Sequence, residues 1–305
     1  MTKRIIVYHD NCHDGITALW CAKQSHEWAD GEPYAGKHGE GPDLERLRGA
    51  HVLIVDFSWK RPELQAVAKV AASLVVLDHH ASAEAELKDF PGCTFDMNRS
   101  GAGLTWDVLH PGKPRPRLVD YVEDRDLWLF KLPFSREVHA ACNCYPTTLE
   151  VRSKLMQVDI DVLGNDGAAI LRYHDKLVES ACRHVTREVI AGFDVPSIAC
   201  PTVELISDVG HRLSIGEPFA ATYMTDEKGT RHYSLRSDGE GQDVGVIATS
   251  LGGGGHKHAA GFRAPDWGVT PKTISWHAET RHPQITRERD PFTGDDIPGQ
   301  YRVTL

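Results

Sequence analysis

The sequence lacks the features of several protein classes. No apolar run approaches the roughly 18 residues that a membrane-spanning helix needs, and runs such as VLIV at 52–55 have the length of a strand. The short apolar run after Arg4 has no small-residue cleavage site behind it, so we expect no signal peptide. The seven cysteines form no Cys-x-x-Cys pair, which favours free thiols and a cytoplasmic location.

Basic charge is also scarce. Lys and Arg number 34 against 43 Asp and Glu, so the formal net charge of the 305 residues is −9. A protein that grips duplex DNA needs a broad basic surface, and we expect no such grip here, although a local positive pocket is compatible with this charge. Gly and Pro are too few for a collagen-like or low-complexity chain, and no internal repeat is visible. The composition is that of a globular protein of about two domains.

The spacing of apolar residues predicts an α/β fold. In the first 130 residues, runs rich in Val, Ile and Leu alternate with helical patterns, which is typical of a parallel sheet with helices on both faces. The expected strands are 4–8, 51–57, 74–77 and 94–97, the expected helices are 14–28 and 62–72, and 30–43 is expected to be a loop. After a helical region, strands are expected again at 195–200, 219–225 and 231–236, with a short helix over 244–251.

These patterns predict four segments. An N-terminal parallel-sheet domain would span 1–165, and a long helix capped by Asn165 would connect it over 166–193 to a smaller α/β domain over 194–262. The last segment, 263–305, has Trp, Pro and balanced charges, and we expect an irregular tail on the surface.

Histidine is abundant, with 17 residues, and several of them stand with aspartates where the expected strands end. HDNCHDG follows the first strand at 9–15, Asp56 ends the second, and Asp78-His79-His80 follows the third, while EDRD at 123–126 follows a helical pattern. Because the carboxyl ends of parallel strands meet at one edge of a sheet, these groups should converge. Imidazole and shared carboxylates suit a two-metal centre of Mn, Zn or Fe.

A structural explanation competes with this one. A single Asp at a strand end is usually a helix cap or turn former, and a lone His is more often a satisfied surface or core residue than a ligand. Three strands in succession with the same chemistry at the same end favour the metal site.

A glycine run near the end of the chain carries a second signal. Gly252–Gly255 precede His256, and AAGF follows at 259–262 as a buried-strand pattern. A glycine tract is by default a flexible linker, but glycines held against a strand let backbone N–H groups approach an anion. Arg236, at the end of an expected strand, could add a bidentate phosphate contact. His256 and His258 as a metal-binding pair is a weaker alternative, because the other ligands are lacking.

Together, DHH at 78–80, the earlier H-x4-DG and the late GGGGHxxAAGF resemble the DHH phosphoesterase superfamily, and the last run resembles its DHH-associated C-terminal substrate-binding domain. The resemblance spans about 4–262. This superfamily includes oligoribonucleases, phosphatases acting on 3′-phosphoadenosine 5′-phosphate, cyclic-dinucleotide phosphodiesterases, RecJ-type exonucleases and pyrophosphatases. The resemblance implies a hydrolase acting on ester bonds with two divalent ions, of which Mn²⁺ is favoured and Mg²⁺ or Co²⁺ are alternatives.

The resemblance also implies roles for individual residues. Asp78 would orient the histidines and His80 would face the substrate phosphate. The implied metal ligands are His9, Asp14, Asp56, His79 and Asp124, with Asp10 as an additional candidate and Asp126 as the close competitor of Asp124. The implied substrate-binding residues are Arg236, Gly253, Gly254, Gly255, His256 and Ser100.

One residue departs from the pattern. Many relatives have an acidic residue two positions before the equivalent of Asp14, where this chain has Cys12. Either Asp10 compensates, or Cys12 is a softer ligand, or one metal position is weaker. We expect hydrolysis of phosphodiester bonds in short oligonucleotides or nucleotide-derived substrates. The alternatives are a phosphatase acting on a small phosphate monoester such as 3′-phosphoadenosine 5′-phosphate or on a pyrophosphate, and a catalytically weakened nucleotide-binding module, which Cys12 favours. No membrane partner is expected, and a homodimer is left open.

Overall fold

The N-terminal lobe is built on a five-stranded sheet. The computed structural model describes residues 3–265, 272–273, 284–289 and 296–304, with side chains described up to residue 264. The strand order is β2-β1-β3-β4-β5 and every pair is parallel. The strands are β1 (Arg4–His9), β2 (Glu32–Gly36), β3 (His51–Val55), β4 (Ser73–Asp78) and β5 (Cys93–Phe95).

Helices cover both faces of this sheet, as the sequence predicts, because the central strands are apolar on both sides. Ile6 and Leu53 pack against one layer, while Ile5, Val7 and Val52 pack against the other. The helices are α1 (His13–Lys23), α2 (Leu44–Leu47), α3 (Arg61–Val70), α4 (Ala81–Leu87) and α5 (Gly101–Leu109).

Strand β2 corrects the loop predicted over 30–43. Its sequence, EPYAG, has a proline and a glycine and buries only its last residue, so neither alternation nor an apolar run marks it. It lies at the edge of the sheet, where a proline is tolerated because one side of the strand needs no hydrogen bonds.

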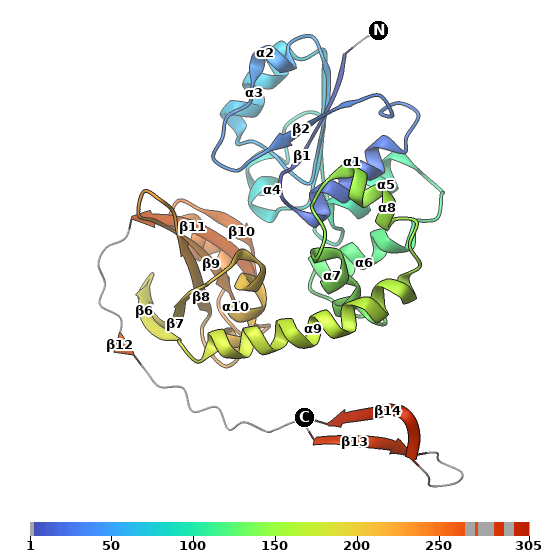
Figure 1. Cartoon of the computed structure of the whole chain (residues 1–305). Coiled ribbons are helices and arrows are strands. Elements are labelled where there is room, and N and C mark those ends of the chain that lie inside the picture. The colour runs from blue at the N-terminus through green and yellow to red at the C-terminus, as the bar shows by residue number, and fades with distance from the viewer. Residues whose placement is uncertain (1–2, 266–271, 274–283, 290–295, 305) are drawn as a thin grey trace.

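A group of helices then leads from one lobe to the other. These are α6 (Arg117–Asp126), α7 (Ser135–Asn143), α8 (Leu149–Leu155) and α9 (Ile160–Cys182). Figure 1 shows α9 extending from the N-terminal lobe to the C-terminal lobe. The predicted connecting helix over 166–193 is wrong at both ends. The side chain of Asp159 caps the helix by accepting from the N–H of Asp161, and strand β6 (Thr186–Ile190) takes the place of its expected last turns. The burial expected of an apolar residue on that helix does not hold there, because Val189 lies on β6 and is 72% exposed.

The C-terminal lobe is a mixed sheet. Its strands are β7 (Phe193–Ala199), β8 (Ala220–Thr225), β9 (Thr230–Arg236), β10 (Gly254–His256) and β11 (Ala259–Pro265), and its helical segments are η1 (Val203–Leu205), α10 (Ile206–Ser214) and α11 (Val244–Ser250). The sheet order is β10-β11-β9-β8-β7-β6-β12. The expected strands at 195–200, 219–225 and 231–236 and the helix at 244–251 are confirmed to within a few residues.

The described part of the expected irregular tail consists of strands. Strand β12 (Lys272–Thr273) pairs with β6, and β13 (Gln284–Arg289) pairs with β14 (Asp296–Thr304). Proline and dense charge hide these strands from a search for apolar runs. Among the described residues, no helix is both long and apolar enough to cross a membrane.

Helix α9 packs closely on α7, and one glycine makes this possible. A Cβ atom at Gly167 would lie 1.7 Å from the backbone oxygen of Glu137, so it cannot be accommodated without moving a helix. We expect Gly167→Ala to lower the free energy of unfolding by about 2–3 kcal/mol, the cost of overpacking a tight contact. Urea denaturation checks this, with the exposed Asp166→Ala on the same helix as the control. Equal midpoints for Gly167→Ala and the wild type would contradict this account of the packing.

Candidate metal centre

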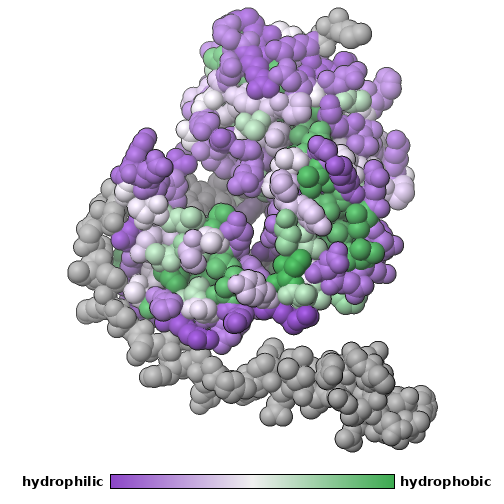
Figure 2. All heavy atoms as spheres, viewed as in Figure 1, coloured by the Kyte–Doolittle hydropathy of each residue, from purple (hydrophilic) through white to green (hydrophobic). Residues whose placement is uncertain are grey.

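A cavity of about 1050 Å³ lies between the two lobes, where Figure 2 shows a hollow. Its N-terminal wall contains the ends of β1, β3 and β4 and residues of α6 and α7, and its C-terminal wall contains residues near the ends of β9 and β10. A cavity of this size is at the upper end of the range for small-ligand sites, and it is adequate for a nucleotide.

Four of the expected ligands meet at one edge of the sheet. Nε2 of His79 lies 3.1 Å from Oδ1 of Asp56 and 3.7 Å from Oδ2 of Asp14. The other oxygen of Asp56, Oδ2, lies 3.5 Å from Nδ1 of His9. Asp56 therefore stands between the two histidines, with one oxygen directed to each.

The local backbone explains these positions. Asp56 has a φ of 54°, a left-handed conformation that Asp and Asn tolerate better than other side chains. A Cβ atom at Gly101 would lie 2.3 Å from Cβ of Asp56, so only glycine allows the start of α5 to approach this closely. The carboxylate of Asp14 accepts the backbone N–H groups of Gly101 and Ala102 at the N-terminus of α5, where the helix dipole favours negative charge.

The third carboxylate beside His79 is Asp126, and the expectation that Asp124 fills this place needs correction. Oδ2 of Asp126 lies 3.6 Å from Nε2 of His79, and Asp126 lines the cavity. Asp124 is buried and its oxygens accept the backbone N–H groups of Lys131 and Leu132. The two residues are two positions apart on α6, so their side chains project about 200° apart around the helix axis. One therefore faces the cavity and the other the protein interior.

Asp10 and Cys12 line the cavity, but their side chains do not join those of His9, Asp14, Asp56 and His79. Asp10 forms an ion pair with Lys37, with 3.6 Å between Oδ2 and Nζ. The described clusters whose ligand atoms lie close enough to share an ion are Asp14, Asp56 and His79; His9, Asp56 and His80; and His79, His80 and His256. Asp10, Cys12 and also Asp126 lie outside them, but Asp126 approaches His79 to 3.6 Å. Burial and the charges of Asp56 and Asp14 raise the pKa of the Cys12 thiol well above its usual value.

The cluster fits divalent ions. Burial and the carboxylates of Asp56 and Asp126 raise the pKa of Asp14 well above its usual value, so the fully charged cluster needs cations. Burial opposes ionisation of Asp56 too, but the neighbouring imidazoles of His79 and His9 hold the pKa of Asp56 well below the usual range. Oδ2 of Asp56 and Nδ1 of His79 are buried without a hydrogen-bond partner among the described residues, so donor atoms remain available. Oxygen and imidazole nitrogen donors suit Mn, Zn or Fe.

Asp78 lies behind the histidines. Its Oδ1 accepts the backbone N–H of His79 at 2.8 Å and lies 2.7 Å from Nδ1 of His80, and its Oδ2 accepts from Ser58 Oγ. Burial opposes ionisation of Asp78, but the charge of His80 and the hydrogen bond from its Nδ1 lower the pKa of Asp78 to about 2. Asp78 is thus a fixed anion that orients the ring of His80 and holds the backbone at His79.

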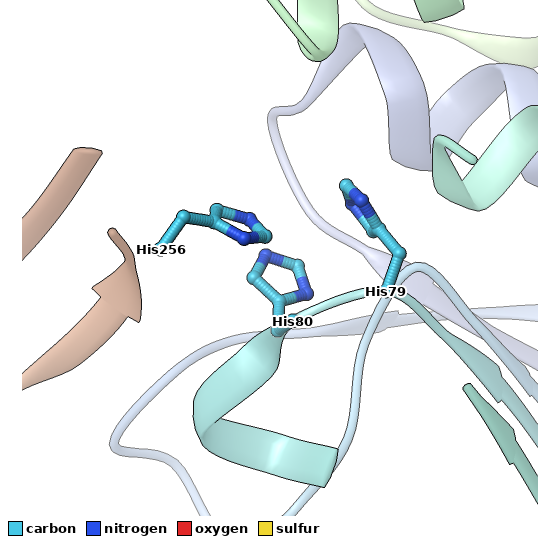
Figure 3. Close-up of side chains that lie close together, drawn as sticks. All are labelled: His79, His80 and His256. Carbon is cyan, nitrogen blue, oxygen red and sulfur yellow. The ribbon is translucent and has the colours of Figure 1, made fainter. Parts of the chain in front are cut away.

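His256 reaches this centre from the other lobe. Its ring stacks on His80 with centroids 4.8 Å apart and lies 5.2 Å from His79. Figure 3 shows the three rings converging, with His79 and His80 on the connection that leads into α4 and His256 on a strand facing them. Burial and the two neighbouring histidines lower the pKa of His256 to about 3, so His256 is neutral at pH 7.

The other expected substrate-binding residues have different surroundings. Arg236 lines the cavity, and its Nη2 donates to Ser207 Oγ at 2.9 Å. Gly253 and Gly255 pack against β11, where a Cβ would lie 1.9 Å from the oxygen of Gly261 and 2.5 Å from Cα of Ala260. Neither they nor Gly254 line the cavity. Ser100 is buried and caps α5 by accepting the N–H of Gly103, so its visible role is structural.

The sequence analysis missed two groups beside the centre. The ring of His38, two residues after the end of β2, packs 4.9 Å from that of His9. No sequence pattern marks it, because it lies in the segment predicted to be a loop. The second group lines the helical wall and consists of His13, His139, Asn143 and Arg152. His13 stands in the HDNCHDG segment at 9–15, but the spacing of His139, Asn143 and Arg152 matches no motif.

Comparisons with known proteins agree with this fold. No family model matches the sequence. A curated relative, Uncharacterized protein R106 of Acanthamoeba polyphaga mimivirus, is 30% identical over 287 residues, which cover 85% of this chain and 66% of that protein. The chain thus spans just under two thirds of the length of this relative.

Two solved structures share the architecture. The DHH domain of a protein assigned to a family of ribosomal proteins has a TM-score of 0.53 at 16% identity, covering 85% of this chain and 82% of that one. RecJ from Thermus thermophilus, in complex with Mn²⁺, has a TM-score of 0.50 at 17% identity, covering 86% of this chain and 49% of that one. The chain therefore has the α/β fold of DHH-domain proteins, and the resemblance drawn from its motifs is confirmed at the level of the fold.

Proposed function

We propose that this protein is a metal-dependent phosphoesterase that hydrolyses phosphodiester bonds of short oligonucleotides or nucleotide-derived substrates. The observation that carries the proposal is the cluster of buried Asp14, Asp56 and His79, with the more exposed Asp126 beside it, on one wall of a nucleotide-sized cavity. Arg236 and His256 stand on the facing wall, where they can hold a phosphate group.

His9, Asp14, Asp56, His79 and Asp126 would hold the ions, and we expect two of them, with Mn²⁺ preferred over Mg²⁺ or Co²⁺. Bound divalent ions supply neutralisation of phosphate charge and a water of lowered pKa. Asp56 directs its two oxygens to two histidines, which suits a carboxylate shared by two ions.

The other groups of the site act on the substrate. Nδ1 of His80 donates to Asp78, and although burial opposes protonation, this carboxylate raises the pKa of His80. In the protonated ring, Nε2–H can donate a hydrogen bond to a phosphoryl oxygen. Arg236 supplies a positive charge opposite the cluster, and the neutral His256 supplies a further hydrogen bond. Together these residues would orient the phosphate between the two walls and stabilise the charge that develops on it.

Two other functions compete with this proposal. The same centre could act on a small phosphate monoester, such as 3′-phosphoadenosine 5′-phosphate, or on a pyrophosphate. Cys12 on the cavity wall favours a third function, a nucleotide-binding module with weakened catalysis, because a neutral thiol occupies a place beside the carboxylates.

A substrate panel separates the three functions. We expect the protein with Mn²⁺ to release mononucleotides from a dinucleotide, to lose this activity with a chelator and to regain it when Mn²⁺ is restored. Metal analysis of the purified protein should find about two ions per chain when both positions are filled. Release of inorganic phosphate only, from a terminal monoester, would replace the proposal by the phosphatase. Nucleotide binding without turnover under any metal would replace it by the binding module.

A further inference from the structure

One face of α9 carries a row of exposed apolar side chains. Val162 is 50% exposed, Tyr173 63% and Leu177 38%, and Ala169 between them is exposed as well. At about 100° per residue, these four lie within about 80° of one another around the helix axis. The residues of α9 that pack against the lobes lie on the opposite side, centred about 170° from Ala169. They are Ile160, Leu163, Gly164, Gly167, Val178, Ala181 and Cys182.

The free charges on this face are divided along the helix. Asp161 stands in the first turn and Lys176 in the second half, and both are exposed. Neither has an ion-pair partner among the residues whose side chains the structure describes. The acids next to Lys176 do have partners within the chain, which are Arg136 for Asp175 and Arg183 for Glu179. The face is therefore acidic at its start and basic toward its end.

Such a face complements a second copy of itself when the two helices run antiparallel. A twofold axis at Ala169 places residues that are equally far before and after it opposite each other. Asp161 and Val162 lie eight and seven positions before Ala169, and Lys176 and Leu177 lie seven and eight after it. Lys176 then meets the partner's Asp161, and Leu177 lies beside the partner's Val162. A parallel pair would instead place like charges together.

We propose that this face of α9, defined by Val162, Ala169, Tyr173 and Leu177, is the interface of an antiparallel homodimer. An apolar helix face can also bind a different protein, but the division of charge favours the same helix as the occupant. One helix per copy buries less surface than a permanent dimer needs, so we expect a weak dimer that forms at high concentration. None of the four residues lines the cavity, so the proposal does not depend on the proposed hydrolysis.

Sedimentation equilibrium of the full chain tests the proposal. The average mass should rise from that of one chain, 33.8 kDa, toward that of two chains. The rise should occur between about 1 and 500 µM, as for a small interface. Tyr173→Ser removes the largest apolar side chain of the face and should weaken association about tenfold or more. Tyr145→Ser, at a tyrosine that is 48% exposed on the cavity wall, is the matched control.

Charge reversal tests the antiparallel arrangement. Lys176→Glu or Asp161→Lys alone should weaken the homodimer about tenfold, because the twofold axis turns two attractions into two repulsions. An equimolar mixture of these two variants should associate to within about threefold of the wild type, since every charge then faces an opposite one. The chain with both reversals should associate equally well. Lys69→Glu, which reverses an exposed charge on α3, is the control.

Three results overturn the proposal. A wild type that stays monomeric at every concentration would leave this face to a different protein. Unchanged association of Tyr173→Ser would place the interface elsewhere on the surface. Weakened single reversals whose mixture does not recover would exclude the antiparallel arrangement.

Circular dichroism checks that each variant keeps the fold. If Asp161→Lys disturbs the first turn of α9, Asp161→Asn replaces it. The chain with Asp161→Asn and Lys176→Glu should then associate more tightly than Lys176→Glu alone, because the repulsion between the two acids is gone. Equal association of these two chains would count against the proposed contact.

Discussion

Replacing Asp56 by asparagine should lower the turnover of a dinucleotide by about 10³-fold or more, the loss expected when charge stabilisation at the reacting group is removed. Asp56 directs one oxygen to His79 and one to His9, so its neutral analogue weakens both sides of the centre. Asparagine is the suitable replacement because it tolerates the left-handed backbone at this position, whereas alanine would add strain.

Two measurements accompany this prediction. Metal analysis of the variant should show fewer bound Mn²⁺ ions than the wild type, and circular dichroism should show the same fold. Asp10→Asn, at a cavity residue paired with Lys37, should lose less than about fivefold in turnover, as for a partly exposed ion pair. Full activity of Asp56→Asn would remove this cluster from consideration as the catalytic centre.

The second prediction concerns the two aspartates on α6. Asp126→Asn should lower turnover by about 10²- to 10³-fold with little loss of stability, because its carboxylate faces His79 across the cavity wall. Asp124→Asn should lower the free energy of unfolding by about 1–3 kcal/mol, because its buried oxygens accept two backbone N–H groups of the turn after α6. Its effect on turnover should be the smaller of the two.

Steady-state kinetics and urea denaturation of both variants make the comparison, and each variant serves as the control for the other. The assignment would be reversed by a stable, inactive Asp124→Asn beside an active Asp126→Asn. If both variants lose activity in proportion to their loss of stability, neither aspartate binds metal, and α6 supports the centre only by keeping the protein folded.

The sequence predicts much of this centre because chain order and strand ends determine it. His9 ends a strand whose apolar residues are easy to recognise, and Asp56 and His79 each follow one, so the parallel arrangement brings them to one edge. The choice between Asp124 and Asp126 could not be made this way. Both lie near the end of one helix, and only the packing of that helix decides which carboxylate faces His79.

Other parts of the molecule were hidden for different reasons. Strand β2 is an edge strand held by backbone pairing, so its side chains carry little signal, and His38 was lost with it. The end of α9 was misplaced because Val185 and Val189 fit a helical spacing as well as a strand. The Arg152–His13 pair joins residues 139 positions apart, and no local pattern announces such a contact.

Helix α9 has a consequence for affinity. Its first turns pack in the N-terminal lobe and its last turns in the C-terminal lobe, while Tyr173 between them is 63% exposed. A helix is a stiff spacer, so the tether confines the two walls of the cavity to a narrow range of separations. A ligand bound to one wall then meets the other wall at a high effective concentration, as in bivalent binding. Two weak affinities therefore combine into a stronger one without an extensive interface. Ligands too short to span the walls would lose this gain altogether.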